Sequence, residues 1–172
     1  MLKRFTFFLI MCCVAGMTAI AQAQEKEANL KAVFIYNFIN YIDWGNSENE
    51  NEFVIGIIGS SEIDNPIAEI AKTNLAKNKT IVIRHFNKVD DIRNCQMLFI
   101  PKNSPFSLKS VLEKIDKGVL TISDEPGLAK QGAAFNFVLV NNKLKFEVNL
   151  KAVYLSGVRV SSQLLKLAII VD

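Results

Sequence analysis

The clearest periodic pattern lies between residues 25 and 42, where apolar side chains return every three or four positions. This spacing places them on one face of a helix. Further isoleucines widen the apolar stripe, which is typical of a helix that contacts protein on two sides. The stripe consists of Leu30, Val33, Phe34, Phe38 and Tyr41, widened by Ile35, Ile39 and Ile42. Trp44 and Gly45 end the predicted helix.

Beyond this helix, short apolar blocks alternate with amphipathic segments. Continuously apolar strands separated by helices indicate a parallel sheet that is covered on both faces. The last predicted helix of this region carries its apolar residues on one face, as a surface helix does. The predicted strands are 53–58, 80–86, 95–100 and 119–123, and the helices between them are 65–74, 88–94 and 105–118.

The pattern changes in the last third of the chain. Two strands, 133–140 and 143–149, flank the dipeptide Asn141-Asn142, which is a good hairpin turn. A helix capped by Asn149 follows, and a last helix begins near Ser161. The predicted fold is a single three-layer α/β domain over residues 24–172: a mostly parallel sheet, a C-terminal antiparallel hairpin and helices on both faces.

The first 23 residues differ in character from the rest. Two basic residues precede an apolar run from Phe5 to Ile20, and Ala21-Gln22-Ala23 follows. This is the pattern of a secretory signal peptide, so we predict that residues 1–23 are a leader cleaved after Ala23. Two alternatives stay open. The run is about long enough for an uncleaved membrane anchor, and Cys12 and Cys13 within it allow a lipoprotein.

Charge and cysteine content narrow the functional classes. The chain has 20 basic and 17 acidic residues and a net charge of +3, which loss of Lys3 and Arg4 with the leader lowers to +1. No long basic run is left for nucleic acid or for electrostatic membrane binding. Only Cys95 remains after cleavage, so no disulfide can form within the mature chain. Cys95 is interpreted as a small buried residue, with an intermolecular bridge as the alternative.

Candidate catalytic and metal-binding residues are few. His85 is the single histidine, and with one remaining cysteine it cannot form a zinc site of several ligands. No G-x-S-x-G motif supplies a nucleophilic serine. His85 is therefore interpreted as an ordinary strand-end residue, and we expect no catalytic residue, no metal and no cofactor.

The stretch ISDEPGLAKQGAAFNF, residues 122–137, contains the adjacent acids Asp124 and Glu125. A general acid–base pair is one interpretation, although adjacent acids usually point apart and no nucleophile is near. Local physical chemistry favours a short helix. Ser123 or Asp124 would be its N-cap, a proline would lie in its first turn, and Gly132 would end it.

Polar residues at the predicted strand ends indicate a possible ligand cleft. In an open parallel sheet, ligands bind beyond the carboxyl ends of the strands. Gly59 and Ser60 follow the first predicted strand, Lys102 follows the third and Asp124 the fourth. The glycine segment lacks the G-x-G-x-x-G and P-loop patterns, so a plain turn is the favoured interpretation there. The four residues are kept as a predicted cleft.

Aromatic residues gather in the first predicted helix and in the last third of the chain. A core position is the favoured interpretation for most of them. A partner surface or an apolar ligand pocket is the alternative. The tail, residues 169–171, either packs on the domain or extends a sheet edge.

Three segments considered together carry a family resemblance. They are LKAVFIYNFINYIDW (30–44), LTISDEPGLAKQGAAFNFVLVNNKLKFEVNL (120–150) and GVRVSSQLLKLA (157–168). The first matches a K-A-x-F-x-Y-N-F helix that ends in tryptophan, the second an S-D segment that runs into paired strands, and the third an S-S-x-L-L-x-L-A close. In order and spacing they resemble the YfiR family of exported bacterial proteins, over residues 29–168.

The resemblance implies a periplasmic, non-catalytic regulatory binding protein with a single α/β domain that is often dimeric. The implied partner is the periplasmic domain of a membrane diguanylate cyclase, which is held inactive, or of a sensor histidine kinase. Loss of such a contact raises cyclic di-GMP and favours biofilm. A periplasmic small-molecule-binding sensor is the alternative function. Redox-responsive relatives carry cysteine pairs in the mature domain, whereas this chain has Cys95 alone.

Overall fold

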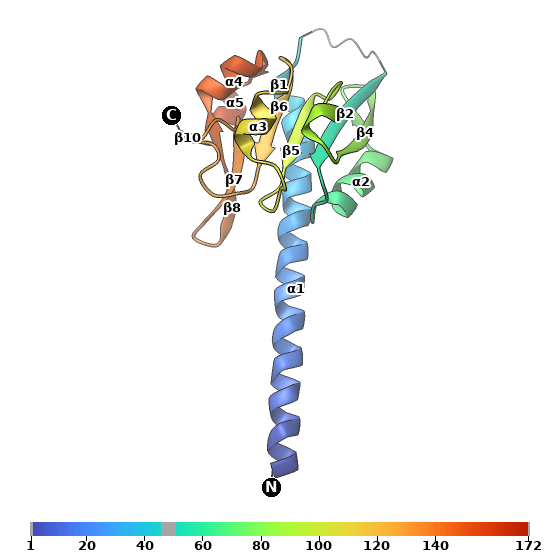
Figure 1. Ribbon diagram of the computed structural model, residues 1–172, viewed down its shortest axis with the longest axis vertical. Coiled ribbons are helices and arrows are strands. Elements are labelled where there is room, and N and C mark those ends of the chain that lie inside the picture. Colours follow the sequence, from blue (N-terminus) through green and yellow to red (C-terminus); the bar gives the residue numbers. More distant parts are fainter. Residues whose placement is uncertain (1, 46–50, 172) are drawn as a thin grey trace.

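The computed structural model describes the backbone of residues 2–45 and 51–171, and within these ranges the side chains from residue 22 onward. Helix α1, Leu2–Tyr41, packs its C-terminal part into the domain, while its N-terminal part projects away from it (Figure 1). Most of the predicted leader, residues 1–23, therefore lies outside the described side chains. Within the described part of the chain, no helix has both the length and the apolar character needed to cross a membrane.

An eight-stranded sheet forms the middle of the domain, in the order β10-β8-β7-β6-β5-β2-β4-β3. The five strands from β7 to β4 run parallel to their neighbours. β8 pairs antiparallel with β7, β3 pairs antiparallel with β4, and β10 runs parallel to β8. The strands are β2 (Glu52–Ile58), β3 (Leu75–Ala76), β4 (Lys79–Phe86), β5 (Met97–Ile100), β6 (Leu120–Ser123), β7 (Phe135–Val140), β8 (Lys143–Asn149) and β10 (Ile169–Val171).

Helices cover both faces of this sheet, as Figure 1 shows for α1 and α3. The larger core joins one sheet face to α1, α2, α4 and α5. The smaller core joins the other face to α3 and to the 3₁₀ turn η1. These elements are α2 (Asp64–Thr73), η1 (Val89–Asp91), α3 (Leu108–Leu112), α4 (Leu150–Ser156) and α5 (Ser162–Leu165). The predicted three-layer α/β fold with a mostly parallel sheet is confirmed.

Strand periodicity explains how one strand supplies both cores. In β2, Ile55 and Ile57 belong to the larger core, while Val54 and Ile58 belong to the smaller one. Successive side chains of a strand point to opposite faces, so a strand covered on both sides must be apolar throughout. The continuous apolar run that predicted this strand is the direct consequence.

A phenylalanine cluster fastens α1 to the C-terminal hairpin. The ring centroid of Phe38 lies 5.0 Å from that of Phe135 and 5.0 Å from that of Phe146, both in edge-on geometry. Phe34 lies 5.9 Å from Phe146 on the same side. Aromatic pairs in this arrangement stabilise beyond the area that they bury. The favoured core interpretation of these aromatic residues is therefore correct.

The C-terminal elements follow the predicted pattern closely. Asn141 and Asn142 have φ of 50° and 57°, which is the backbone that a two-residue hairpin loop requires. The tail 169–171 extends the sheet edge as β10. A second, two-stranded sheet was not predicted: β1 (Ile42–Asp43) pairs with β9 (Arg159–Val160). Neither pair of residues carries a local strand pattern, because the strands exist only through their mutual contact.

The predicted helix that Asp124 caps and Gly132 ends is wrong. Residues 126–132 form consecutive turns instead of a helix. Gly127 and Gly132 have φ of 85° and 115°, outside the helical region. Side chains of neighbouring strands hydrogen-bond the backbone of this segment, and such bonds compete with helical ones. The proline and the acids therefore begin a loop, and Asp124 is no helix cap.

Candidate functional site

The carboxyl ends of β2, β5 and β6 meet at one polar cavity of about 420 Å³. Three of the four residues predicted for the ligand cleft, Ser60, Lys102 and Asp124, lie in its lining. Gly59 lies beside the cavity and not in it: its N–H donates to Phe86 O, and its carbonyl oxygen is 3.0 Å from His85 Nδ1. The cavity is lined by Ser60, Ser61, Glu62, Pro101, Lys102, Asn103 and Asp124.

Asp124 is held at the back of this cavity by two partners. Its Oδ2 accepts a hydrogen bond of 2.7 Å from Lys31 Nζ, and its Oδ1 accepts one of 2.7 Å from the Lys102 N–H. The side chains of Lys31 and Asp124 are only 4% and 7% exposed. Lys31 also contacts Glu27 Oε1 at 2.7 Å, one turn earlier on α1. A buried charge is tolerated when it is paired and hydrogen-bonded in this way.

The protonation of Lys31 follows from these contacts. Burial acts to lower its pKa, because desolvation disfavours the charged form. Hydrogen bonds and electrostatic attraction from Asp124 and Glu27 outweigh burial, and the pKa of Lys31 lies above its ordinary value of 10.5. Lys31 is therefore a cation at neutral pH and keeps α1 attached to the loop after β6.

The arrangement is suited to holding a ligand more than to acid–base chemistry. Both oxygens of Asp124 accept hydrogen bonds and its side chain is 7% exposed, so this carboxylate serves as an anchor between α1 and the end of β5. Glu125 is exposed and its N–H donates to Ser123 Oγ. Lys102 Nζ lies 4.0 Å from Glu62 Oε1 at the cavity rim. A polar ligand could replace this long contact between Lys102 and Glu62, whereas the Lys31–Asp124 pair is shorter and buried.

Buried polar side chains on the neighbouring strands hold the segment 124–134 in place. Thr121 Oγ1 accepts a hydrogen bond from Ala134 N at 2.9 Å. Asn149 Nδ2 donates to Ala129 O at 2.8 Å, and its Oδ1 accepts from Ala152 N at 2.8 Å. Asn149 is thus the N-cap of α4 and also an anchor of the loop. These bonds explain why a segment rich in turn residues has one defined path.

The remaining polar candidates do not form a second centre. His85 is exposed near the end of β4. Cys95 is buried in the smaller core, and burial raises the pKa of its thiol to about 12. Among the described residues, no group of three or more histidine, cysteine or acidic side chains is placed to hold a metal ion.

Lys31 is the residue of this site that sequence reasoning missed. It lies inside the apolar stripe of α1 and is flanked by Leu30 and Ala32. Glu27, one helical turn before it, gives a local sign of pairing. Its contact with Asp124 joins positions 93 residues apart, which no local pattern indicates. A lysine in the buried stripe of a helix, with an acid one turn before it, is the signal that the sequence offers.

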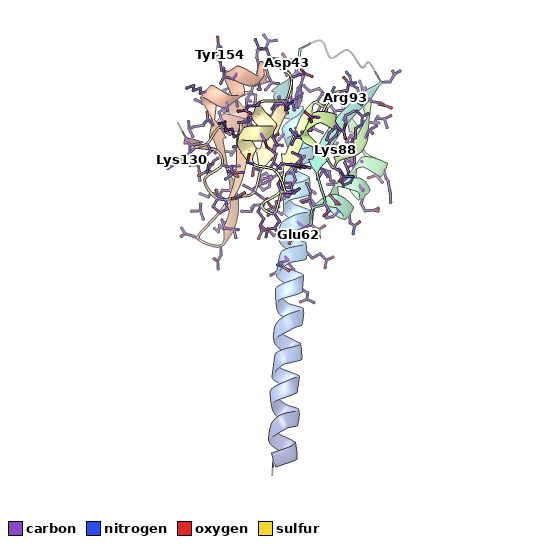
Figure 2. The ribbon with its side chains drawn as sticks, viewed as in Figure 1. Asp43, Glu62, Lys88, Arg93, Lys130 and Tyr154 are labelled. Atoms are coloured by element: carbon purple, nitrogen blue, oxygen red, sulfur yellow. The ribbon has the colours of Figure 1, made fainter. Side chains whose placement is uncertain are left out.

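A second feature lies on the C-terminal elements. Apolar side chains on α4 and on the tail face solvent, and Tyr154 is 82% exposed (Figure 2). Leu167 is 70% exposed and Leu155 is 61% exposed. We call Leu150, Tyr154, Leu155, Leu167 and Ile170 the C-terminal apolar surface.

Comparison with protein families places the fold and these residues in context. A family model described as YfiR/HmsC-like matches residues 28–169. The match includes Lys31, Asp124 and Asn149, and it spans the strands of the large sheet up to the first residue of β10. The matched region begins at residue 28 on α1 and ends at residue 169, the first residue of β10. The chain therefore belongs to the YfiR/HmsC-like family.

Proposed function

We propose that this protein is an exported, periplasmic regulatory binding protein that controls a membrane-bound signalling enzyme. The controlled enzyme is a diguanylate cyclase or a sensor histidine kinase, contacted through its periplasmic domain. Membership of the YfiR/HmsC-like family is the observation that carries this proposal, because proteins of this type are regulators and not catalysts. Release of the contact raises cyclic di-GMP and favours biofilm if the partner is a cyclase.

The C-terminal apolar surface supports a role in binding. Tyr154 and Leu167 are both more than two-thirds exposed, and aromatic residues are enriched at protein interfaces. Export of the chain is supported by the leader-like pattern of residues 1–23. A second copy of the chain is an alternative occupant of this surface, since the family resemblance implies a domain that is often dimeric.

The test is capture of periplasmic domains of membrane cyclases and kinases by the exported protein. Tyr154→Ser and Leu167→Ser should each weaken capture. Leu75→Ser is the matched control, because Leu75 is 56% exposed on β3 at the far edge of the sheet. Deletion of the gene should raise cyclic di-GMP, and the wild-type gene should restore it. Absence of capture, together with unchanged cyclic di-GMP after deletion, rejects the regulatory role.

A small-molecule sensor is the second candidate function, favoured by the cavity that Ser60, Lys102 and Asp124 line. A polar metabolite in this cavity would contact Asp124 and could alter the attachment of α1 through Lys31. A ligand that binds only the folded state must raise the melting temperature. Nucleotides and polar metabolites that leave the melting temperature of the exported protein unchanged would argue against this function.

A further inference from the structure

A second cavity, of about 430 Å³, lies between α3 and α4, on the C-terminal side of the domain. We propose that it binds a small amphipathic anion, with an apolar body and a single carboxylate. Its volume falls within the range of ordinary small-molecule sites. Its lining combines five apolar residues with three lysines and two buried polar groups. None of these residues lines the polar cavity at the strand ends.

Apolar side chains from two parts of the chain line this cavity. Leu112 and Ile115 contribute from the α3 side, together with Val119 just before β6. Ala152 and Leu155 contribute from α4. The Gly118 N–H donates to Ser156 O at 2.6 Å, which joins the loop after α3 to the end of α4. A lining of this kind favours a hydrocarbon or aromatic body, since burying apolar surface stabilises the complex.

Positive charge surrounds the same cavity. The lining contains three lysines, which are Lys117, Lys130 (labelled in Figure 2) and Lys151. It contains one acidic residue, Asp116. Within the described residues, none of these three lysines has a carboxylate within ion-pair distance. Unpaired cations beside an apolar space attract an anion and raise its local concentration. The excess of positive charge therefore selects a carboxylate over an amine.

A buried threonine in the lining of the cavity offers a hydrogen-bond donor. Thr121 is 3% exposed, and its Oγ1 accepts from Ala134 N. In the part of the chain that the structure describes, the Thr121 hydroxyl donates to no protein acceptor. A hydroxyl has one proton to donate in addition to its acceptor lone pairs. A ligand oxygen beside it would satisfy that donor, whereas a hydrocarbon group would leave it unpaired.

The polar cavity at the strand ends has a different character. It combines Lys102 with Glu62 and Asp124, so it has no comparable excess of positive charge. It also lacks a lining of leucine and isoleucine. The two cavities therefore favour different ligands, and an amphipathic monocarboxylate fits the one between α3 and α4.

Titration of the exported protein with sodium octanoate and with 4-phenylbutyrate tests this assignment. Calorimetry measures the affinity, and amide NMR shifts at Gly132 and Leu155 report the location. We expect saturable binding of both acids, and binding of methyl octanoate and octylamine that is weaker by about tenfold or more. The experiment needs no partner protein, so its outcome is independent of the regulatory proposal.

Variants locate the site within the chain. Lys130→Ala combined with Lys151→Ala should weaken octanoate binding by about tenfold, while Lys143→Ala on the hairpin should leave it unchanged. Ala152→Trp should fill the space and abolish binding. If Ala152→Trp does not fold, Leu155→Gln provides the test instead and should weaken octanoate binding. The fold should tolerate this substitution, because Leu155 is 61% exposed.

Three results would overturn the proposal. The first is the absence of saturable shifts with either acid. The second is equal affinity for octanoate and its methyl ester, because the lysines would then have no role. The third is binding that survives Leu155→Gln and the double lysine substitution unchanged, because the acid would then occupy another part of the protein.

Discussion

Lys31 Nζ on α1 lies 2.7 Å from Asp124 Oδ2 in the loop after β6, although 93 positions separate the two residues. The second oxygen of Asp124 accepts the Lys102 N–H at the end of β5. One carboxylate therefore connects the first helix with two strand ends. Any change at the polar cavity that moves Asp124 also acts on the attachment of α1.

Asp124→Asn should destabilise the fold by about 3 kcal/mol, because loss of the carboxylate leaves Lys31 buried without its strongest partner. The asparagine oxygen can still accept the Lys102 N–H, so the substitution isolates the charge. Urea unfolding followed by circular dichroism measures the change. Glu27 remains as a partner of Lys31, which keeps the loss at the lower end of the range for buried pairs.

Two further variants complete this test. Asp91→Asn, at an exposed acid of η1, is the matched control and should leave the free energy of unfolding nearly unchanged. Lys31→Met combined with Asp124→Asn should cost less than the sum of the single changes, since the two residues interact directly. Strict additivity would contradict the assigned contact. A catalytic Asp124 would instead lose activity with little loss of stability.

The ion pair should also give stability a defined pH dependence. The pKa of Lys31 is raised in the folded state above the 10.5 of the unfolded chain. The stability that charged Lys31 contributes to the fold is therefore fully present below pH 10.5 and is lost as pH rises through the folded pKa. The difference in free energy of unfolding between wild type and Lys31→Met should stay constant from about pH 7 to pH 10 and narrow above that.

A series of urea titrations at increasing pH measures this difference. Lys143→Met, at an exposed position of the hairpin, is the control and should show no comparable narrowing. A difference that grows as pH rises toward the unfolded pKa of 10.5 would mean that the fold lowers the pKa of Lys31, contrary to its pairing with Asp124 and Glu27.

Asn149→Ala should destabilise the protein by about 2 kcal/mol, because one side chain performs two tasks. It caps α4 through Ala152 N and satisfies the buried Ala129 carbonyl. Urea unfolding measures the loss. Gln163→Ala, an exposed position on α5, serves as control. A loss no larger than that of the control would show that the loop holds its path without this anchor.

Cys95 should resist thiol reagents in the native protein. Burial raises the pKa of its thiol to about 12, so almost no thiolate is present near neutral pH. The side chain is also 5% exposed. Reaction with a chromogenic disulfide should be slow in buffer and fast in concentrated urea. Complete native labelling within seconds would contradict the burial of this residue.

Much of the fold could be read from periodicity because burial on both faces forces continuous apolar strands. The segment 53–58 shows this: it predicted the central strand β2 to within one residue. The hairpin was equally clear, since Asn141 and Asn142 tolerate the left-handed backbone of a tight turn. The failure at 124–132 has the opposite origin. There the proline and glycines fit a helix start and stop as well as they fit a loop.

The α/β class, the main strands and the hairpin could be predicted from the amino-acid sequence, because they follow from local patterns of burial and turn chemistry. The family was indicated separately, by the resemblance of three segments to its motifs. The same patterns placed Ser60, Lys102 and Asp124 together, since the carboxyl ends of parallel strands share one edge. The role of Asp124 required the folded chain. Its partner Lys31 comes from a distant helix, and a contact between distant residues depends on packing that no local pattern contains. The cavity between α3 and α4 likewise exists only once the folded elements enclose it.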